Sequence, residues 1–241
     1  MKDTSIIFGI RSVIEAIEND RNIDRVLIKR GLQGELFLEL KKLIDKNRIP
    51  FQNVPVERIN RVVNKNHQGV IAYISPVEYQ DFHKVYDKVE ATGKIPRFLM
   101  LDGLTDVRNF GAIARTAECA GFDAIVVPEK GSAPLSSDAI KTSAGALFNI
   151  PVCKASNLWY ILKYLKEKSF LIVAASEKAE TKYTEVDYSS PVILVMGSED
   201  KGISTQVQKL VDKNVSIPIK GTISSLNVSV AAGILMYEIV K

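Results

Sequence analysis

Apolar positions alternate between helical and strand-like spacing over residues 1–75. Residues 9–19 (GIRSVIEAIEN) and 35–47 (ELFLELKKLIDKN) place apolar side chains three and four positions apart, which predicts two amphipathic helices. Residues 24–30 (DRVLIKR) and 69–75 (GVIAYIS) are short and rich in β-branched residues, which predicts strands. A PFQNV segment and a short helix near VERINRVV precede the last of these strands. We therefore expect a small α/β domain here.

Residues 76–95 (PVEYQDFHKVYDKVEATGKI) show no clean helical or strand-like spacing. The segment is polar and contains Pro76 and Gly93, and both residue types interrupt regular elements. We expect it to be a linker between two domains.

Residues 96–241 repeat a rhythm of strand and helix. The expected strands are RFLMLDGL, AIVVP, PVCK, FLIVAASE, VILVMGS and NVSIPI. The expected helices are NFGAIARTAECAG, SSDAIKTSAGALF, NLWYILKYLKEK, STQVQKLVD and SLNVSVAAGILMYEIVK. Continuous apolar strands that alternate with helices predict a parallel sheet covered on both faces. Such sheets bind ligands at the carboxyl ends of their strands, which selects the loops at 102–111, 197–203 and 218–226.

The composition limits the chemistry of the protein. Apolar residues make up 46% and charged residues 25%, which is ordinary for a globular protein. No secretory signal and no run of 18 uncharged apolar residues is visible, so we expect no membrane span. The two cysteines, Cys119 and Cys153, cannot form a convincing zinc site with only two histidines. We expect a cytoplasmic protein that uses no metal.

The net charge of +4 is distributed unevenly. Residues 1–75 carry 13 Lys and Arg against 9 Asp and Glu, whereas residues 76–241 carry 19 of each. A basic module beside a neutral one suggests an anionic partner for the first. The alternative is a solvated surface whose charge asymmetry arose by chance.

The loop at 102–111 leads into a helix of small and apolar residues. Asn109 lies near the start of this helix, where an asparagine can act as the N-cap. Arg115 follows six residues later, roughly on the same side. An arginine is unexpected in such a helix, and it either serves the function or is a snorkelling or ion-paired side chain.

The loop at 197–203 lies within VILVMGSEDKGIS, whose layout is close to the phosphate-binding loop G-x-x-x-x-G-K-[ST]. Ile203 stands where that motif has lysine, and Glu199 and Asp200 would repel phosphates. A zwitterionic or cationic ligand fits the loop better. Alternatively, the loop is a plain turn whose glycines provide positive φ.

The third loop, IPIKGTISSLNVSVAAG, places Ser224, Ser225 and Asn227 before a strongly apolar final helix. Ser225 is a candidate N-cap, which would put Asn227 in the first helical turn. The chain has no G-x-G-x-x-G fingerprint, so we do not expect an ordinary dinucleotide site. The three loops by themselves indicate an enzyme that binds a nucleotide-like ligand.

Taken together, the three loops resemble a known family. N-F-G-A-I-A-R-T-A, V-M-G-S-E-D-K-G-I-S and I-P-I-x-G-x-I-S-S-L-N-V-S-V-A-A-G are similar to the three motifs of the SpoU (TrmH-type) RNA 2′-O-ribose methyltransferases of the SPOUT superfamily. F-G-I-R-S-V-I-E-A-I and N-H-Q-G-V-I-A (66–72) resemble the small RNA-binding domain that precedes the catalytic domain in many members. The resemblance covers nearly the whole chain and is closest to the RlmB-like group, which methylates a guanosine ribose in 23S ribosomal RNA.

The resemblance implies an α/β architecture that periodicity alone does not reveal. A small α/β RNA-binding domain over 1–75 would precede a parallel-sheet SPOUT catalytic domain over 96–241, whose C-terminal segment forms a trefoil knot. General rules for chain connections exclude knots, so spacing could not have predicted one. The resemblance also implies S-adenosylmethionine as cofactor, RNA as substrate and a homodimer with the site near the subunit interface.

Motif positions carry the family's functional residues onto this chain. The polar catalytic set falls on Asn109, Arg115, Glu199, Ser225 and Asn227. The expected cofactor contacts are Gly197, Ile217 and Leu226, with Met196 and Pro218 adjacent. In the first domain, the residues expected to contact RNA phosphates are Arg11, Lys29 and Arg30.

The implied reaction transfers a methyl group in line from a sulfonium to a ribose 2′-oxygen. The family account makes Arg115 the base, which is awkward because a free guanidinium stays protonated far above neutral pH. Our hypothesis is that Arg115 holds a neighbouring phosphate and directs a hydrogen bond at the 2′-oxygen, with the nearby sulfonium able to depress its pKa. Glu199 would orient Arg115 or the RNA.

Three alternatives stay open at this point. One is the same chemistry on transfer RNA, and another is self-protection against an antibiotic by methylation of ribosomal RNA. The third is a catalytically degenerate protein that binds RNA or ribosomes, and the complete set of five polar residues argues against it. The N-H-Q-G-V-I-A motif favours ribosomal RNA, by analogy only.

Overall fold

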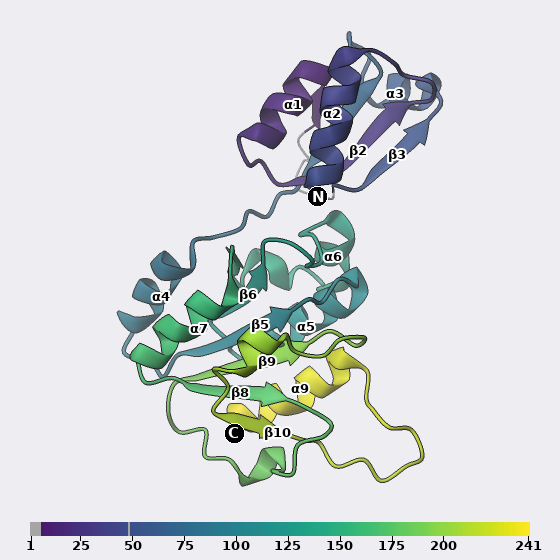
Figure 1. Cartoon of the computed structure of the whole chain (residues 1–241). Coiled ribbons are helices and arrows are strands. Elements are labelled where there is room, and N and C mark those ends of the chain that lie inside the picture. The colour runs from purple at the N-terminus through teal and green to yellow at the C-terminus, as the bar shows by residue number, and fades with distance from the viewer. Residues whose placement is uncertain (1–5, 48) are drawn as a thin grey trace. The chain divides into compact units, whose positions relative to one another are not determined.

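The computed structural model describes residues 6–47 and 49–241 (Figure 1). The chain divides into two compact units between residues 78 and 79, with residues 135–137 grouped with the first unit. No helix in the described part of the chain is long and apolar enough to cross a lipid bilayer.

The first unit is built on a four-stranded sheet with the order β1-β4-β2-β3. Its strands are β1 (Ile6–Phe8), β2 (Ile23–Lys29), β3 (Phe51–Val54) and β4 (Val70–Ile74). β4 pairs antiparallel with β1 and β2, whereas β3 pairs parallel with β2. These elements confirm the strands that the spacing predicts.

Helices cover both faces of this sheet. They are α1 (Ile10–Glu18), α2 (Glu35–Lys46) and α3 (Val56–Val62). The apolar stripes of α1 and α2 pack with alternate residues of β2 and β4, and Ile59 of α3 packs with Leu27 and Ile71 on the opposite face. The helices at 9–19 and 35–47 are therefore confirmed, and burial of their apolar stripes is the reason that they form.

Residues 76–95, expected to be a linker, contain the helix α4 (Phe82–Glu90). Asp81 caps it by accepting a hydrogen bond from the backbone N–H of Lys84 at 2.9 Å. Phe82 and Tyr86 are buried in the core of the second unit. The expectation of an irregular segment was wrong here, because the apolar stripe is narrow and the rest of the helix surface is polar.

The second unit contains a six-stranded sheet with the order β10-β8-β9-β5-β6-β7. Its strands are β5 (Arg97–Asp102), β6 (Ala124–Pro128), β7 (Val152–Ala155), β8 (Leu171–Ala175), β9 (Val192–Gly197) and β10 (Lys213–Val215). Every pairing is parallel, which confirms the predicted sheet. The carboxyl ends of the strands consequently lie at one edge.

Helices cover this sheet on both faces (Figure 1). α4, α7 (Leu158–Glu167) and α8 (Thr205–Gln208) pack into one core cluster with Phe98 and Met100 of β5. α5 (Val107–Cys119) and α9 (Val228–Ile239) lie side by side, and α9 packs on β9. The remaining short elements are α6 (Ser137–Thr142) and the 3₁₀ turns η1 (Ala146–Phe148) and η2 (Tyr183–Glu185).

Three elements are shorter than the spacing predicts. The helix expected over SSDAIKTSAGALF ends at Thr142, because Ala144 and Gly145 have positive φ angles of 51° and 89°, and only the 3₁₀ turn η1 follows. The helix expected over STQVQKLVD is the single turn α8, and the strand expected over NVSIPI ends at Val215. Pro218 has no N–H to donate to a neighbouring strand, so the chain continues to α9 without regular pairing. The topology is consistent with a trefoil knot, which stays a prediction.

Candidate active site

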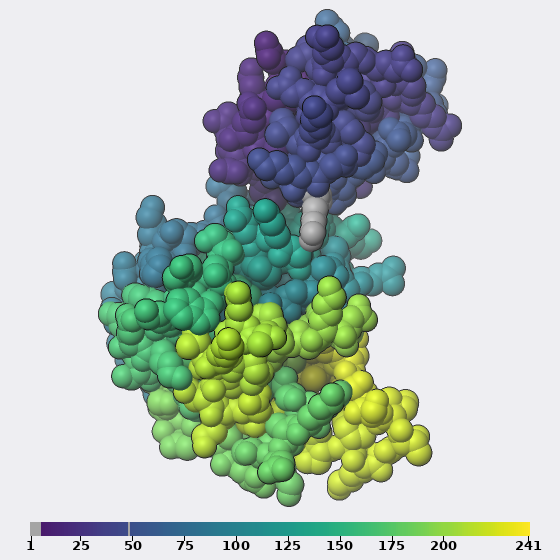
Figure 2. Space-filling model, in the orientation of Figure 1, coloured from purple at the N-terminus to yellow at the C-terminus, as the bar shows by residue number. Residues whose placement is uncertain are grey.

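A cleft of about 420 Å³ lies within the second unit at the carboxyl edge of its sheet. Its walls come from residues 175–178 at the end of β8 and 196–203 at the end of β9. Further walls come from Val215, Ile217 and Ile219 at and after β10, and from 224–226 with the inner side of α9. Figure 2 shows a recess between these segments, in the green and yellow part of the surface. This volume is in the range of pockets that hold small organic ligands.

The loop at 197–203 forms one wall because it turns back onto its own strand. A Cβ atom added to Gly197 would lie 2.3 Å from the carbonyl carbon of Gly202 and 2.5 Å from the nitrogen of Ile203. Ser198 and Gly202 exchange two backbone hydrogen bonds, of 3.1 and 2.8 Å. Gly202 itself has a φ of 64°. Glycine is therefore required at 197 by lack of space and favoured at 202 by conformation.

The end of this loop is held to a neighbouring strand. The backbone N–H of Ser204 donates to Oδ2 of Asp102, the last residue of β5, at 2.7 Å. Since β5 and β9 are adjacent in the sheet, this bond fixes the loop above their carboxyl ends.

Three polar side chains from different loops form one hydrogen-bonded cluster beside the cleft. Nδ2 of Asn109 donates to Oε1 of Glu199 at 3.1 Å. Nδ2 of Asn227 donates to Oδ1 of Asn109 at 3.1 Å and to Oε1 of Glu199 at 3.3 Å. The structure thus brings together three of the five predicted catalytic residues, although up to 118 positions separate them.

The helix caps differ from those expected. Asp106 is the N-cap of α5, since its Oδ1 accepts from the N–H of Asn109 at 2.7 Å. Asn227, and not Ser225, is the N-cap of α9, since its Oδ1 accepts from the N–H of Ser229 at 2.9 Å. Both expectations were wrong because Asp, Asn and Ser are similarly good caps, so propensity does not select among candidates two or three residues apart.

The corrected caps explain how the cluster forms. Asn109 lies in the first turn of α5 with its side-chain amide directed to Glu199 instead of its own helix. Asn227 uses its oxygen to cap α9 and its nitrogen to bind Asn109 and Glu199. One side chain therefore performs a structural and a positioning task.

Arg115 and Ser225 complete the predicted set without joining the cluster. Arg115 is exposed on α5, and within the described chain it has no hydrogen bond or ion pair. Glu199 bonds to the two asparagines and not to Arg115, so the structure does not show the pairing considered for them. Ser225 lines the cleft.

Four of the five residues expected to contact a cofactor line the cleft. They are Met196, Gly197, Ile217 and Leu226. Pro218 is not among the described residues that line it, although its neighbours Ile217 and Ile219 are.

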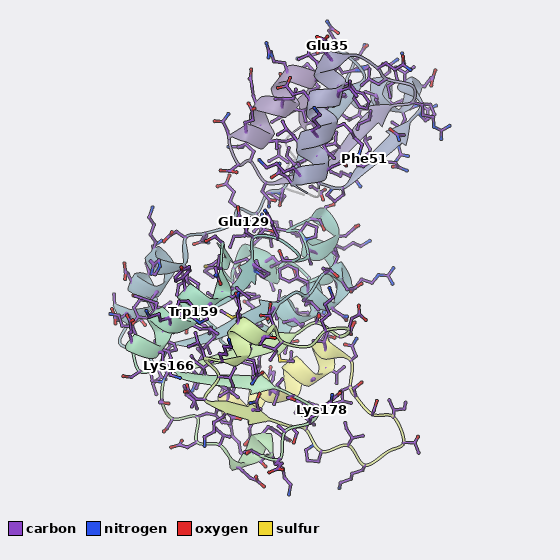
Figure 3. The ribbon with its side chains drawn as sticks, in the orientation of Figure 1. Glu35, Phe51, Glu129, Trp159, Lys166 and Lys178 are labelled. Carbon is purple, nitrogen blue, oxygen red and sulfur yellow. The ribbon has the colours of Figure 1, made fainter. Side chains whose placement is uncertain are left out.

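Sequence reasoning missed the wall formed by residues 175–178, which includes Ser176, Glu177 and Lys178 (Lys178 is labelled in Figure 3). These residues follow the carboxyl end of β8, so the rule that selected the other loops also applies to them. The rim of the cleft carries the carboxylates of Glu177, Glu199 and Asp200 and the ammonium groups of Lys178 and Lys201. Such a mixed rim suits a ligand with charges of both signs.

Three exposed basic residues of the first unit lie on neighbouring segments, which we call the basic end of this unit. The N–H of Ile10, beside Arg11, donates to Oε1 of Gln68 at 3.1 Å, and the N–H of Lys29 donates to the carbonyl of Gly69 at 2.7 Å. The 68–69 turn therefore brings the start of α1 next to the end of β2. This arrangement places three exposed side chains together, namely Arg11, Lys29 and Arg30.

No group of three or more His, Cys, Asp or Glu side chains among the described residues is placed to hold a metal ion. Cys153 is buried, and this burial raises the pKa of its thiol to about 12, which keeps it protonated and unreactive at neutral pH. Cys119 is an exposed free thiol.

The comparison with known families agrees with this geometry. Residues 96–237 match the SpoU rRNA methylase family, and residues 6–80 match the substrate-binding domain of RNA 2′-O-ribose methyltransferases. The chain belongs to the SpoU (TrmH) family of RNA 2′-O-ribose methyltransferases. As a SpoU methylase, it has both domains that the motifs predicted.

Individual relatives support the assignment along the whole chain. A protein of Staphylococcus saprophyticus, provisionally named as a TrmH family tRNA/rRNA methyltransferase, is 37% identical over 236 residues, which cover 98% of this chain and 95% of the relative. The crystal structure of the SpoU methyltransferase AviRb from Streptomyces viridochromogenes, in complex with the cofactor AdoMet, has a TM-score of 0.62 at 21% identity and covers 98% of this chain and 88% of AviRb.

A second solved structure extends the fold comparison. The AdoMet-bound rRNA methyltransferase from Sinorhizobium meliloti has a TM-score of 0.59 at 24% identity, with 97% of this chain and 85% of that chain covered. Both structures show that this SpoU methylase shares their overall fold.

Substitutions of Asn227 separate its two tasks. We expect Asn227→Asp to keep the cap of α9 but to lose the donor to Asn109 and Glu199, so RNA methylation is lost. The new carboxylate also faces that of Glu199, so charge repulsion should lower stability modestly. We expect Asn227→Ala to lose both, with about 1 kcal/mol less stability. Thermal unfolding and methyl-transfer assays measure the two effects. Full activity in Asn227→Asp would show that the cluster needs no amide at this position.

Proposed function

We propose that this SpoU methylase transfers a methyl group from S-adenosylmethionine to the ribose 2′-hydroxyl of a guanosine in 23S ribosomal RNA. The observation that carries the proposal is the cluster of Asn109, Glu199 and Asn227 beside a ligand-sized cleft. The matched family is described as an rRNA methylase family, and the Sinorhizobium meliloti neighbour is an rRNA methyltransferase. Both support ribosomal RNA as the substrate.

The cleft fits the proposed cofactor. Gly197, Ile217 and Leu226 would hold it, with Met196 adjacent and the other residues of the 197–203 loop along the same wall. Because Gly197 has no side chain, the loop can fold back onto β9 and form this wall of the cleft. When bound, S-adenosylmethionine supplies an activated methyl group on a positively charged sulfonium. The carboxylates at the rim, Glu177, Glu199 and Asp200, favour a ligand with positive groups.

The polar residues have different roles in the proposed methyl transfer. Both amide donors bind Oε1 of Glu199, so the carboxylate is held in place while Oε2 can accept the hydrogen of the ribose 2′-hydroxyl. Arg115, without a competing partner in the described structure, can bind the adjacent phosphate and stabilise negative charge that develops on the 2′-oxygen. Ser225 at the cleft can hold the ribose by a hydrogen bond.

We infer that the protein acts as a homodimer in the cytoplasm. α9 supports the dimer, because Val230 is 51% exposed and Tyr237 is 55% exposed although the helix is apolar on nearly every side. A second copy of the chain would cover these side chains. The cytoplasmic location rests on the proposed substrate, ribosomal RNA.

Transfer RNA is the second candidate substrate. The name of the Staphylococcus saprophyticus relative includes both tRNA and rRNA, which supports transfer RNA as a second candidate. A degenerate RNA-binding protein is disfavoured, because the hydrogen-bonded cluster is complete.

Incubation with labelled S-adenosylmethionine tests the proposal directly. Unmodified 23S ribosomal RNA and transfer RNA are offered separately, and the labelled nucleotide is then mapped. We expect the label on the 2′-oxygen of one guanosine in 23S ribosomal RNA. Label in transfer RNA alone would establish the second candidate. If the labelled methyl group were transferred to neither RNA, the proposed enzymatic activity would be refuted.

Gly197 provides a test of cofactor binding. In Gly197→Ala the new methyl group overlaps the backbone of Gly202 and Ile203, so the loop must move. We expect S-adenosylmethionine to bind on the order of 10-fold more weakly, a loss of about 1.4 kcal/mol, in calorimetric titrations. The matched control is Gly221→Ala, because a Cβ atom at Gly221 meets nothing within 4 Å. Equal affinities for the two variants would contradict a role of the loop in binding.

Arg115 provides a test of transition-state stabilisation. We expect Arg115→Ala to lower kcat at saturating RNA by on the order of 10² or more. Arg115→Lys should recover only part of the activity, since an ammonium lacks the planar donor pair of a guanidinium. Arg108→Ala, an exposed arginine on the same helix, should keep wild-type kcat. Near-normal turnover of Arg115→Ala would exclude both the base and the phosphate-holding roles.

The salt dependence of RNA binding tests the basic end of the first unit. Loss of one phosphate contact in Lys29→Ala should lower the slope of log K against log salt by roughly 0.7–0.9. Lys46→Ala removes an equally exposed charge from the C-terminal turn of α2 and should leave the slope unchanged. Filter binding over a range of salt concentrations measures both, and an unaltered slope for Lys29→Ala would argue that this end does not contact RNA.

A further inference from the structure

The outer side of α7 carries an aromatic and basic stripe for which the proposed reaction has no use. Asn157 caps the helix by accepting from the N–H of Trp159 at 2.9 Å. The aliphatic residues of α7 are buried in the sheet core, whereas Trp159, Tyr160 and Lys163 lie on the outer side. These three residues, which we call the α7 stripe, occupy the first two turns of the helix (Trp159 is labelled in Figure 3).

The stripe has the geometry of a platform for a planar ring. The rings of Trp159 and Tyr160 are 5.1 Å apart at 80°, so each supports the edge or face of the other. Tyr160 is 64% exposed, more than any other aromatic side chain in the described chain. Nζ of Lys163 lies 5.5 Å from the centroid of the Trp159 ring.

The charge of Lys163 is not neutralised. The other two lysines near the end of α7 have acidic partners, since Lys166 pairs with Asp212 at 2.8 Å and Lys168 with Glu90 at 3.9 Å. Lys163 is exposed and has no acidic partner within the described chain. A positive group next to an exposed ring suits a nucleotide, which presents a base and a phosphate together.

The stripe lies at the same edge of the sheet as the cleft. α7 follows the carboxyl end of β7, and the cleft lies at the carboxyl ends of β8, β9 and β10, with its loop tied to β5. β7 is two strands from β5, or about 10 Å at the usual strand spacing. A single RNA strand that leaves the cleft across the end of β6 would therefore meet the stripe.

We propose that the α7 stripe stacks a base of single-stranded RNA that flanks the methylated nucleotide, with Lys163 on its phosphate. The proposal rests on the proposed function for the identity of the ligand. An apolar protein partner fits less well, because Tyr160 is the one large apolar side chain on α7 that is more than about a third exposed. Stacking on exposed aromatic rings is how single-stranded nucleic acid is commonly bound without sequence preference.

The sole tryptophan of the chain makes binding directly observable. Titration of the full-length protein with a mixed-sequence single-stranded RNA oligonucleotide should quench the fluorescence of Trp159. We expect Tyr160→Ala to weaken RNA binding and raise KM for RNA roughly 5- to 100-fold, with kcat at saturating RNA unchanged. Tyr160→Phe keeps the ring and should behave as wild type.

A pair of lysine variants on the same helix controls for charge. Lys163→Ala should lower the salt slope of RNA binding by roughly 0.7, the value for one phosphate contact on a single strand. Lys168→Ala removes a lysine that also lies over aromatic rings, at 5.4 and 5.8 Å, but at the opposite end of α7. It should leave the slope unchanged.

The outcomes distinguish this inference from the proposed function. Suppose that Tyr160→Ala methylates RNA with the wild-type KM and that RNA does not quench Trp159. This result would refute RNA binding by the α7 stripe and leave the proposed methylation reaction standing. A surface that binds another protein would give the same result. Quenching that Tyr160→Ala abolishes, in a protein that methylates neither RNA, would support the stripe as an RNA surface and refute the proposed reaction.

Discussion

The close approach of the backbone at Gly197 to that of Gly202 and Ile203 is the constraint on which the site depends. No side chain fits at 197, so β9 can be followed at once by a loop that reverses onto it. The reversal exposes Glu199 at the loop and forms one wall of the cleft. The bond from Ser204 to Asp102 then ties the loop to the adjacent strand, so this wall of the cleft and the polar cluster are positioned by the same few contacts.

The helices and strands that carry the polar cluster fix the relative positions of its three side chains. Each of its hydrogen bonds is partly exposed to water and contributes on the order of 1 kcal/mol. Such bonds cannot by themselves order three distant loops. The parallel sheet and the packing of α5 beside α9 bring the loops together, and the hydrogen bonds then select side-chain orientations. Arg115 remains unpaired in the described structure, which suits a group that binds only when RNA arrives.

Spacing alone predicted most of the sheet, because buried parallel strands are continuous apolar runs such as VILVMG. It missed α4, where three buried side chains form a stripe too narrow to stand out from a polar segment. It misplaced both helix caps, because local preference does not distinguish Asp106 from Asn109 or Ser225 from Asn227. The motifs predicted candidate site residues, and only the folded chain shows that Glu199 bonds to two asparagines instead of Arg115.

The double role of Asn227 has a consequence for the order in which the chain acquires activity. A nascent chain that has reached Leu226 already contains the six strands, α5 and the loop at 197–203. It has neither the cap of α9 nor the amide that joins Asn109 to Glu199. Because the same side chain starts the helix and completes the cluster, the full cluster forms only after α9 has been synthesised and has folded. Completion of the polar cluster is thus coupled to the folding of α9.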